Sequence, residues 1–246
     1  MPHKHTRTKV VCTIGPASST PEALRALMLA GLDVARVNFS HGTHEQHAAR
    51  IADIRTIAAE LNRPVAILGD LQGPRIRVGN LDAPITLVEG SDVTLAFEGV
   101  AGAADIPVTY DDLATDVTAG ARILLDDGLL ALDVVKVDGA RVHCRVVYGG
   151  LLKSHKGMNL PGVKVSAPTL TEKDRADIVF AVAHDLDYLA LSFVRQPSDM
   201  DTLRALVPKG VLLVSKIEKD QALHDIEEIL KASDAVMVAR GDLGVE

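Results

Sequence analysis

The 246-residue chain carries 26 Lys and Arg against 33 Asp and Glu, so its formal net charge is −7. This balance argues against a protein that binds nucleic acid or a membrane surface through a basic face. Hydrophobic residues make up 47% and charged residues 24%, as in a globular protein with a large core, and no apolar run reaches the roughly 18 residues of a membrane span.

The beginning of the chain and its cysteines indicate where the protein works. Residues 2–7 are basic, but no apolar segment of signal-peptide type follows them. Cys12 and Cys144 lie far apart and show no pairing pattern, which fits a reducing compartment. These features predict a cytoplasmic protein.

Strands and helices are predicted to alternate over the first third of the chain. Thr20–Glu22 supplies a helix N-cap followed by proline at the first helical position, and Thr43–Gln46 forms a capping box. Near-continuous apolar strands indicate a parallel sheet that is covered by helices. The predicted strands cover residues 9–14, 34–39 and 65–68.

The pattern changes between about Gly73 and Pro168, where no long helix is predicted. Short alternating segments separated by Gly, Pro and Asp are typical of a small all-β domain. These segments cover residues 85–88, 92–96, 122–125, 129–137 and 141–147. The β-rich part is therefore an insertion into a β/α array.

The alternation of helix and strand resumes after Pro168. The predicted helices cover residues 171–183, about 198–206 and about 220–231. The predicted strands cover residues 188–193, 211–217 and 235–239.

Polar residues stand at the carboxyl ends of five predicted strands. Because the carboxyl ends of parallel strands meet at one edge, where β/α proteins build their active sites, this coincidence indicates a functional site. The residues are Asn38 and Ser40, Asp70, Ser192, Lys216 and Glu218, and Asp242.

Two of these groups suggest specific chemistry. Lys216, Glu218 and Asp242 could hold a divalent cation beside an anionic substrate. Arg36, Asn38 and Ser40 alternate with apolar residues, so they share one face of a strand. We interpret Arg36 as an anion holder and the other two as oxygen donors to a metal, with a solvated strand face as the alternative.

Other basic residues give weaker indications. Arg75 and Arg77 follow Asp70 closely, which suggests phosphate handling, although a surface ion pair is also compatible. Lys156 precedes a glycine and could approach a nucleotide phosphate or simply form a polar turn. His41, taken alone, indicates a loop hydrogen bond.

Five motifs, found in order from about residue 8 to the end, resemble pyruvate kinase. They are residues 9–17 (KVVCTIGPA), 36–42 (RVNFSHG), 156–162 (KGMNLPG), 215–218 (SKIE) and 240–246 (RGDLGVE). The resemblance implies an α/β fold of the (β/α)8 TIM-barrel type, here with about six strands, and an inserted all-β, barrel-like lid domain after strand 3. The implied boundaries are 1–74 and 169–246 for the two parts of the barrel and 75–168 for the lid.

The resemblance also implies the reaction and its residues. Phosphoenolpyruvate passes its phosphoryl group to ADP, giving pyruvate and ATP, and a full-length homotetramer is implied. Lys216 stabilises the transition state, and the substrate contacts Arg36, Gly241 and Asp242. The metal ligands are Glu218 and Asp242, for Mg²⁺ or Mn²⁺. The nucleotide contacts are Arg77, Lys156 and His41, and the monovalent-cation ligands are Asn38, Ser40, Asp70 and the Leu71 carbonyl.

Two departures from the family pattern lead to further expectations. Arg75 stands where many members have glutamate, so we expect its guanidinium to supply the charge of K⁺ and make K⁺ dispensable. Without the insertion, about 152 residues remain for the barrel, whereas about 250 are typical. We therefore expect two strands and the regulatory domain to be missing, and the chain alone to be weakly active or inactive.

Two other functions remain open at this stage. One is a Mg²⁺-dependent carbon–carbon lyase that acts through a pyruvate enolate, and the other is an inactive truncated binding module. The insertion, Arg77 and Lys156 favour the kinase, because they suit a second phosphorylated substrate.

Overall fold

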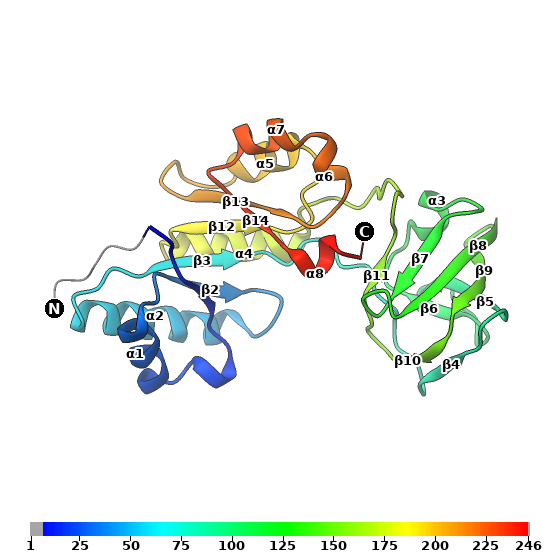
Figure 1. The fold of residues 1–246 in the computed structure, drawn as a ribbon, viewed down its shortest axis with the longest axis horizontal. Coiled ribbons are helices and arrows are strands. Elements are labelled where there is room, and N and C mark those ends of the chain that lie inside the picture. Colours follow the sequence, from blue (N-terminus) through cyan, green and yellow to red (C-terminus); the bar gives the residue numbers. More distant parts are fainter. Residues whose placement is uncertain (1–6, 246) are drawn as a thin grey trace. The chain divides into compact units, whose positions relative to one another are not determined.

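The computed structural model describes residues 7–245, which form two compact units (Figure 1). The first unit contains the residues up to Gly73, Thr169–Ile217 and Asp225–Met237. The second contains Pro74–Pro168, Glu218–His224 and the residues from Val238 onward. Among the described residues, no helix has the length and apolar character needed to cross a membrane.

The first unit is built on a six-stranded sheet in the order β1-β2-β3-β12-β13-β14. The strands are β1 (Val11–Thr13), β2 (Val34–Asn38), β3 (Ala66–Asp70), β12 (Tyr188–Leu191), β13 (Leu212–Ile217) and β14 (Ala235–Val238). The pairs from β1 to β13 are parallel, and the spatial order follows the chain order, as in a β/α barrel. The predicted fold class is confirmed.

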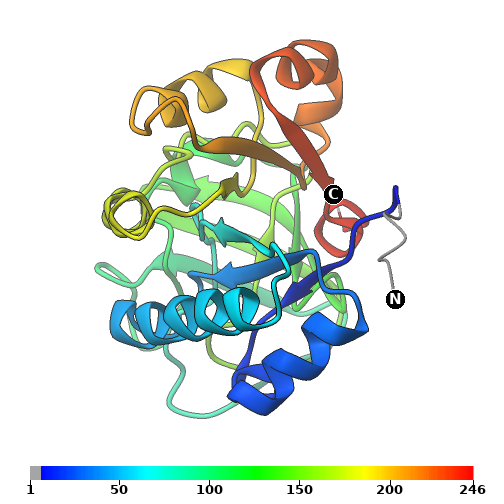
Figure 2. The ribbon, with the colours of Figure 1, turned by 90° about the vertical axis from the view of Figure 1, so that its left-hand side faces the viewer.

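Helices cover the outer face of this curled sheet (Figure 2). They are α1 (Pro21–Ala30), α2 (His44–Glu60), α4 (Glu172–Ala183), α5 (Pro197–Arg204) and α7 (Ile226–Ala232). The predicted caps are present, because Thr20 accepts the Ala23 N–H and Thr43 forms a capping box with Gln46. Gly31 ends α1 at a φ of 115°, a left-handed conformation that suits glycine.

The predicted helix over residues 220–231 is divided in two. A short helix, α6 (Gln221–His224), precedes α7, and the chain leaves helical geometry at Asp225 (φ −112°, ψ 22°). Aspartate is a poor residue for a helix interior because its side chain competes for backbone hydrogen bonds. Apolar spacing alone could not reveal this break.

Phe39 anchors the carboxyl end of β2 in the core. The ring is 1% exposed and meets His47 and Phe180 edge-on, with centroids 5.2 and 5.9 Å away. A Cβ at Gly69 on β3 would lie 2.7 Å from the Phe39 ring, so only glycine fits there. The sequence of β3 therefore makes room for the residue that fixes the end of β2.

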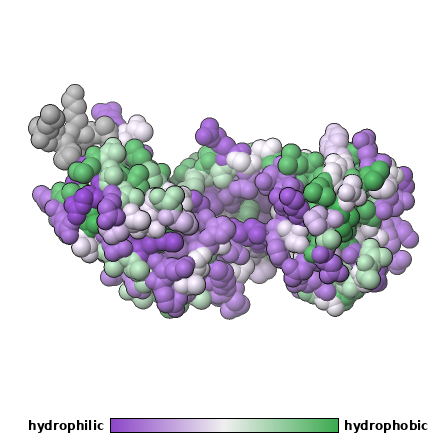
Figure 3. All heavy atoms as spheres, turned by 90° about the horizontal axis from the view of Figure 1, so that it is seen from below, coloured by the Kyte–Doolittle hydropathy of each residue, from purple (hydrophilic) through white to green (hydrophobic). Residues whose placement is uncertain are grey.

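The edge strands of the first unit carry exposed apolar side chains. Val11 on β1 is 50% exposed and Val236 on β14 is 40% exposed. On the face drawn in Figure 3, hydrophilic and hydrophobic residues are interspersed.

The second unit is mainly β-structure. Its six-stranded sheet has the order β11-β7-β8-β9-β5-β6, and β10 pairs with β4. The strands are β4 (Ile85–Leu87), β5 (Asp92–Phe97), β6 (Ile106–Val108), β7 (Arg122–Leu125), β8 (Leu130–Asp138), β9 (Arg141–Tyr148), β10 (Gly150–Leu152) and β11 (Met158–Asn159). The sequence did not predict β6, β10, β11 or the one-turn helix α3 (Leu113–Asp116), because such short elements show no periodicity.

Candidate functional site

Charged side chains gather at the carboxyl edge of the sheet in the first unit. Arg36 lies on β2, Asp70 ends β3 and Lys216 lies near the end of β13. The parallel register pairs β2 with β3 and β3 with β12, so residues far apart in sequence reach the same edge. This is the edge at which the sequence predicted a site.

Asp70 is the centre of this cluster, and its side chain is 1% exposed. Its Oδ2 accepts a hydrogen bond from Arg36 Nε at 2.7 Å and also contacts Arg36 Nη2. Its Oδ1 lies 3.3 Å from Lys216 Nζ. One carboxylate thus faces two cations, and the excess positive charge of these three groups suits an anionic ligand.

Lys216 is held by a chain of hydrogen bonds. Its side chain is 11% exposed, and Nζ donates to Ser192 Oγ at 2.8 Å. Ser192 in turn donates to the Leu71 carbonyl at 2.7 Å. Together with Asp70, Ser192 therefore fixes the position of the ammonium group at the carboxyl edge.

Arg36 is the more accessible of the two cations, with 24% of its side chain exposed. Its Nη1 donates to Thr13 Oγ1 at 2.6 Å, so residues on β1 and β3 both orient the guanidinium. The sequence interpretation missed Thr13. Its position at the end of β1, next to Arg36 in the strand register, was the available signal.

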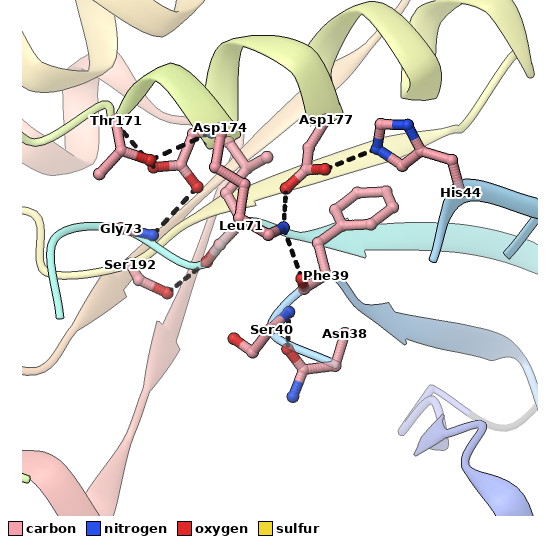
Figure 4. Close-up of polar contacts among 11 residues, drawn as sticks. Asn38, Phe39, Ser40, His44, Leu71, Gly73, Thr171, Asp174, Asp177 and Ser192 are labelled. Atoms are coloured by element: carbon pink, nitrogen blue, oxygen red, sulfur yellow. Dashed lines mark hydrogen bonds and ion pairs between the residues drawn. The ribbon is translucent and has the colours of Figure 1, made fainter. Parts of the chain in front are cut away.

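The four residues proposed as monovalent-cation ligands lie at the ends of β2 and β3. The register pairs Asn38 with Asp70, and the Phe39 N–H donates to the Asp70 carbonyl at 3.0 Å. Asn38 Oδ1 accepts the Ser40 N–H at 3.0 Å, which turns the chain sharply (Figure 4). The structure therefore brings Asn38, Asp70 and the segment with Ser40 into one neighbourhood.

The first two turns of α4 approach the same loops, as Figure 4 shows. Lys173 bonds the Phe39 carbonyl, and Asp174 bonds the Gly73 N–H. Neither residue was identified from the sequence, although the spacing of Lys173 and Asp177 is that of a helical ion pair.

Two residues proposed to bind nucleotide approach each other in the second unit. Arg77 forms an antiparallel bridge with Gly157, directly after Lys156. The Lys156 carbonyl accepts the Val78 N–H at 2.9 Å, and its ammonium lies 2.7 Å from Asp126 Oδ1. Two basic side chains are thus carried by adjoining backbone segments.

The remaining predicted site residues are placed as follows. Glu218 is 2% exposed and comes directly after β13, whereas Gly241 and Asp242 are exposed in the one-turn helix α8 (Arg240–Leu243). His41 is exposed and Arg75 is half-buried. Within residues 7–245, no group of three or more His, Cys, Asp or Glu side chains is arranged to hold a metal ion.

Burial shifts the pKa values of two buried side chains outside this cluster, His47 and Cys144. Burial lowers the pKa of His47, which is 1% exposed and packs against Phe39. Burial raises the pKa of the Cys144 thiol to about 12, so Cys144 acts as a core residue of the second unit.

The family model and the similar proteins that match this chain identify the same family. Residues 5–246 match the family model "Pyruvate kinase, barrel domain". The chain is 49% identical over 248 residues to pyruvate kinase of Geobacillus stearothermophilus and 48% identical to that of Staphylococcus haemolyticus. Each match covers 98% of this chain but only 42% of the relative's length. The chain belongs to the pyruvate kinase family.

Proposed function

We propose that the protein containing these residues transfers a phosphoryl group from phosphoenolpyruvate to ADP, giving pyruvate and ATP. The observation that carries the proposal is the cluster in which buried Asp70 orients both Arg36 and Lys216. Phosphoryl transfer depends on positioning and charge neutralisation, so it needs fixed cations and no protein nucleophile. The family match supports the same reaction.

Arg36 is proposed to hold the substrate phosphate, because a guanidinium can bind phosphate in a bidentate manner and hydrogen bonds to Asp70 and Thr13 fix its orientation. Lys216 is proposed to face the transferring group. As the bond from phosphorus to the enol oxygen breaks and the bond to the ADP β-phosphate oxygen forms, negative charge grows on the enolate oxygen. The fixed ammonium stabilises that charge.

Glu218 and Asp242 are proposed as ligands of Mg²⁺ or Mn²⁺. Two carboxylates match the oxygen preference of these ions, and substrate phosphates commonly complete such sites. When bound, the metal neutralises charge on the transferring phosphoryl group. Gly241, next to Asp242, is proposed to contact the substrate through its backbone.

The second unit is proposed to contribute the nucleotide contacts Arg77 and Lys156, with His41 contributed by the first unit. This is the role of a lid domain, with proposed boundaries at 75–168 between barrel segments 1–74 and 169–246. The adjoining placement of the two cations in the second unit supports the proposal.

Arg75 is proposed to replace K⁺ beside Asn38, Ser40, Asp70 and the Leu71 carbonyl. The expected result is an enzyme that reaches full activity without K⁺. The variant Arg75→Glu should become K⁺-dependent, because it restores a carboxylate and removes a fixed cation. An unchanged need for K⁺ in both proteins would contradict this role.

The family match supports the kinase and gives no support to the carbon–carbon lyase. A cytoplasmic location and a homotetramer for the whole enzyme remain proposals that rest on the sequence. The chain alone is expected to turn over slowly or not at all, because the relatives are more than twice as long.

The proposal is tested in two steps. The purified chain should bind phosphoenolpyruvate in the presence of Mn²⁺, measured by calorimetry, and Arg36→Met should weaken this binding. A chimera that joins the chain to the remaining residues of the Geobacillus stearothermophilus enzyme should form pyruvate and ATP. If the chain binds no phosphoenolpyruvate and the folded chimera is inactive, the proposal fails.

A further inference from the structure

We infer that Lys173, Asp174 and Asp177, on the first two turns of α4, are positioning residues that hold the loops after β2 and β3 in their binding geometry. The inference rests on the proposed function, because these loops carry Asn38, Ser40 and Leu71. It assigns a functional part to a helix that contributes no proposed ligand.

Lys173 holds the loop after β2. Its Nζ donates to the Phe39 carbonyl at 2.7 Å and lies 2.6 Å from Asp177 Oδ2. Phe39 stands between Asn38 and Ser40, so this bond fixes the peptide unit that separates the two proposed oxygen donors (Figure 4). A charge-assisted hydrogen bond to a carbonyl is stronger than a neutral one, so this bond restrains the position of the loop effectively.

Asp177 keeps Lys173 in place. Its side chain is 2% exposed, and its second oxygen, Oδ1, lies 2.7 Å from His44 Nε2 on the first turn of α2. The carboxylate therefore connects α4 to α2 and binds the Lys173 ammonium on the side of the loop. The stacking of His44 on Phe180, with centroids 4.5 Å apart, further limits movement of this group.

Asp174 holds the loop after β3 in the same way. It is 0% exposed, and its Oδ1 accepts the Gly73 N–H at 3.1 Å. Its Oδ2 accepts the N–H and hydroxyl of Thr171, at 2.9 and 2.6 Å, which closes the capping box of α4. Gly73 has a φ of 66°, so the loop turns here and Asp174 stabilises the turn.

The Phe39 ring packs against Phe180 of α4, but packing around the loop that follows Phe39 is incomplete. A hollow of about 260 Å³ lies there, lined by Phe39, Gly42, Thr43, His44, His47, Lys173, Ala176 and Asp177. Because close contacts are missing across a hollow, the bond from Lys173 to the Phe39 carbonyl carries more of the restraint. Its loss should therefore release the loop more than it destabilises the fold.

The test uses Lys173→Met in the 246-residue chain, which keeps the length of the side chain and removes its charge. The matched control is Lys231→Met on α7, because Lys231 also pairs with a carboxylate of its own helix, Glu228, at 2.5 Å. Lys173→Arg is the conservative variant that can still bond the carbonyl.

Two readouts separate positioning from stability. Hydrogen exchange at the amides of Phe39, Ser40 and His41 reports on the loop, because all three are hydrogen-bonded in the structure. In Lys173→Met, exchange at these amides should accelerate at least about 10-fold, and affinity for phosphoenolpyruvate with Mn²⁺ should fall about 10- to 100-fold. Lys173→Arg should recover both partly, and Lys231→Met should change neither.

Each outcome bears on the inference. Unchanged exchange at the three amides would overturn it, and so would a released loop with unchanged affinity for phosphoenolpyruvate. If the unsubstituted chain binds no phosphoenolpyruvate and the folded chimera is inactive, the proposed function fails, whereas the exchange comparison still decides whether Lys173 holds the loop. Asp174→Asn gives a second measurement at the Gly73 amide, where faster exchange is expected.

Discussion

The two edges of the sheet in the first unit use aspartate in opposite ways. At the amino edge, an aspartate stands one residue before each of β2, β12 and β14 and accepts a backbone N–H from the neighbouring strand or from the residue just before it. The bonds are Asp33 to Val10 at 2.8 Å, Asp187 to Ile67 at 2.7 Å and Asp234 to Leu213 at 2.7 Å. These carboxylates complete the sheet where its strands begin.

At the carboxyl edge, Asp70 instead faces the side chains of Arg36 and Lys216. The amino-edge carboxylates bind backbone amides, and Asp33 and Asp234 also pair with the partly exposed side chains of Lys9 and Arg204. A guanidinium or an ammonium group has further donors, so Asp70 can orient it toward a ligand. From this comparison we expect the amino edge to contribute to stability and the carboxyl edge to bind the ligand.

The largest expected effect is the loss of Lys216. In the chimera with the Geobacillus stearothermophilus enzyme, Lys216→Met should lower the rate of phosphoryl transfer about 100- to 1,000-fold, because a fixed cation at the developing charge is lost. Lys231→Met, on the exposed surface, is the control and should keep the rate. Equal rates in the two variants would remove Lys216 from the mechanism.

Removing an aspartate at the amino edge should lower the stability of the fold and leave ligand binding unchanged. Asp187→Ala removes the acceptor of the Ile67 N–H and should lower the free energy of unfolding by about 1 kcal/mol, measured by urea denaturation. Binding of phosphoenolpyruvate by the folded variant should not change. Weaker binding at unchanged stability would show that the two edges are not separate.

Lowering the pH should first affect His47, a buried residue of α2 that packs against Phe39 at the end of β2. Burial lowers the pKa of His47 below its ordinary value of 6.5, so the folded chain binds a proton less readily than the unfolded chain. The free energy of unfolding should therefore fall as the pH drops below about 6.5. His47→Leu should flatten this part of the stability curve, and a curve of unchanged slope would contradict the assignment.

The aspartates at the amino edge should lose their contribution to stability only in stronger acid. Backbone hydrogen bonds from Val10 and Leu213 lower the pKa values of Asp33 and Asp234 below the ordinary 3.8. Their contribution is complete above pH 3.8 and is lost as the pH falls through the lowered values. The melting temperature of Asp33→Asn/Asp234→Asn should therefore depend less on pH below about 4. The effect is small because both side chains are partly exposed.

Much of the fold could be predicted from sequence because its signals are local. The caps at Thr20 and Thr43 and the apolar strands placed five helices and the six strands of the first sheet in the correct order. The break at Asp225 was not predicted, because apolar spacing does not reveal it. The strands β6, β10 and β11 were not predicted, because two or three residues are too few to show a period.

The candidate site, too, could be predicted from the sequence only in part. Polar residues at strand ends identified Arg36, Asp70 and Lys216, because a strand end is visible in one sequence. Thr13 and the α4 residues Lys173, Asp174 and Asp177 were not identified. Their partners lie on other elements, and local patterns carry no information about contacts across more than 100 residues, such as Lys173 with Phe39.

The sequence by itself determined the alternation of strands and helices, the inserted β segment and the edge at which polar residues collect. Hydrophobic periodicity and capping are properties of neighbouring residues, so they need no tertiary information. Only the tertiary structure decided which aspartates bond backbone amides and that Asp70 lies between Arg36 and Lys216. A carboxylate takes its role from the donors that the register of the sheet and the packing of α4 bring to it.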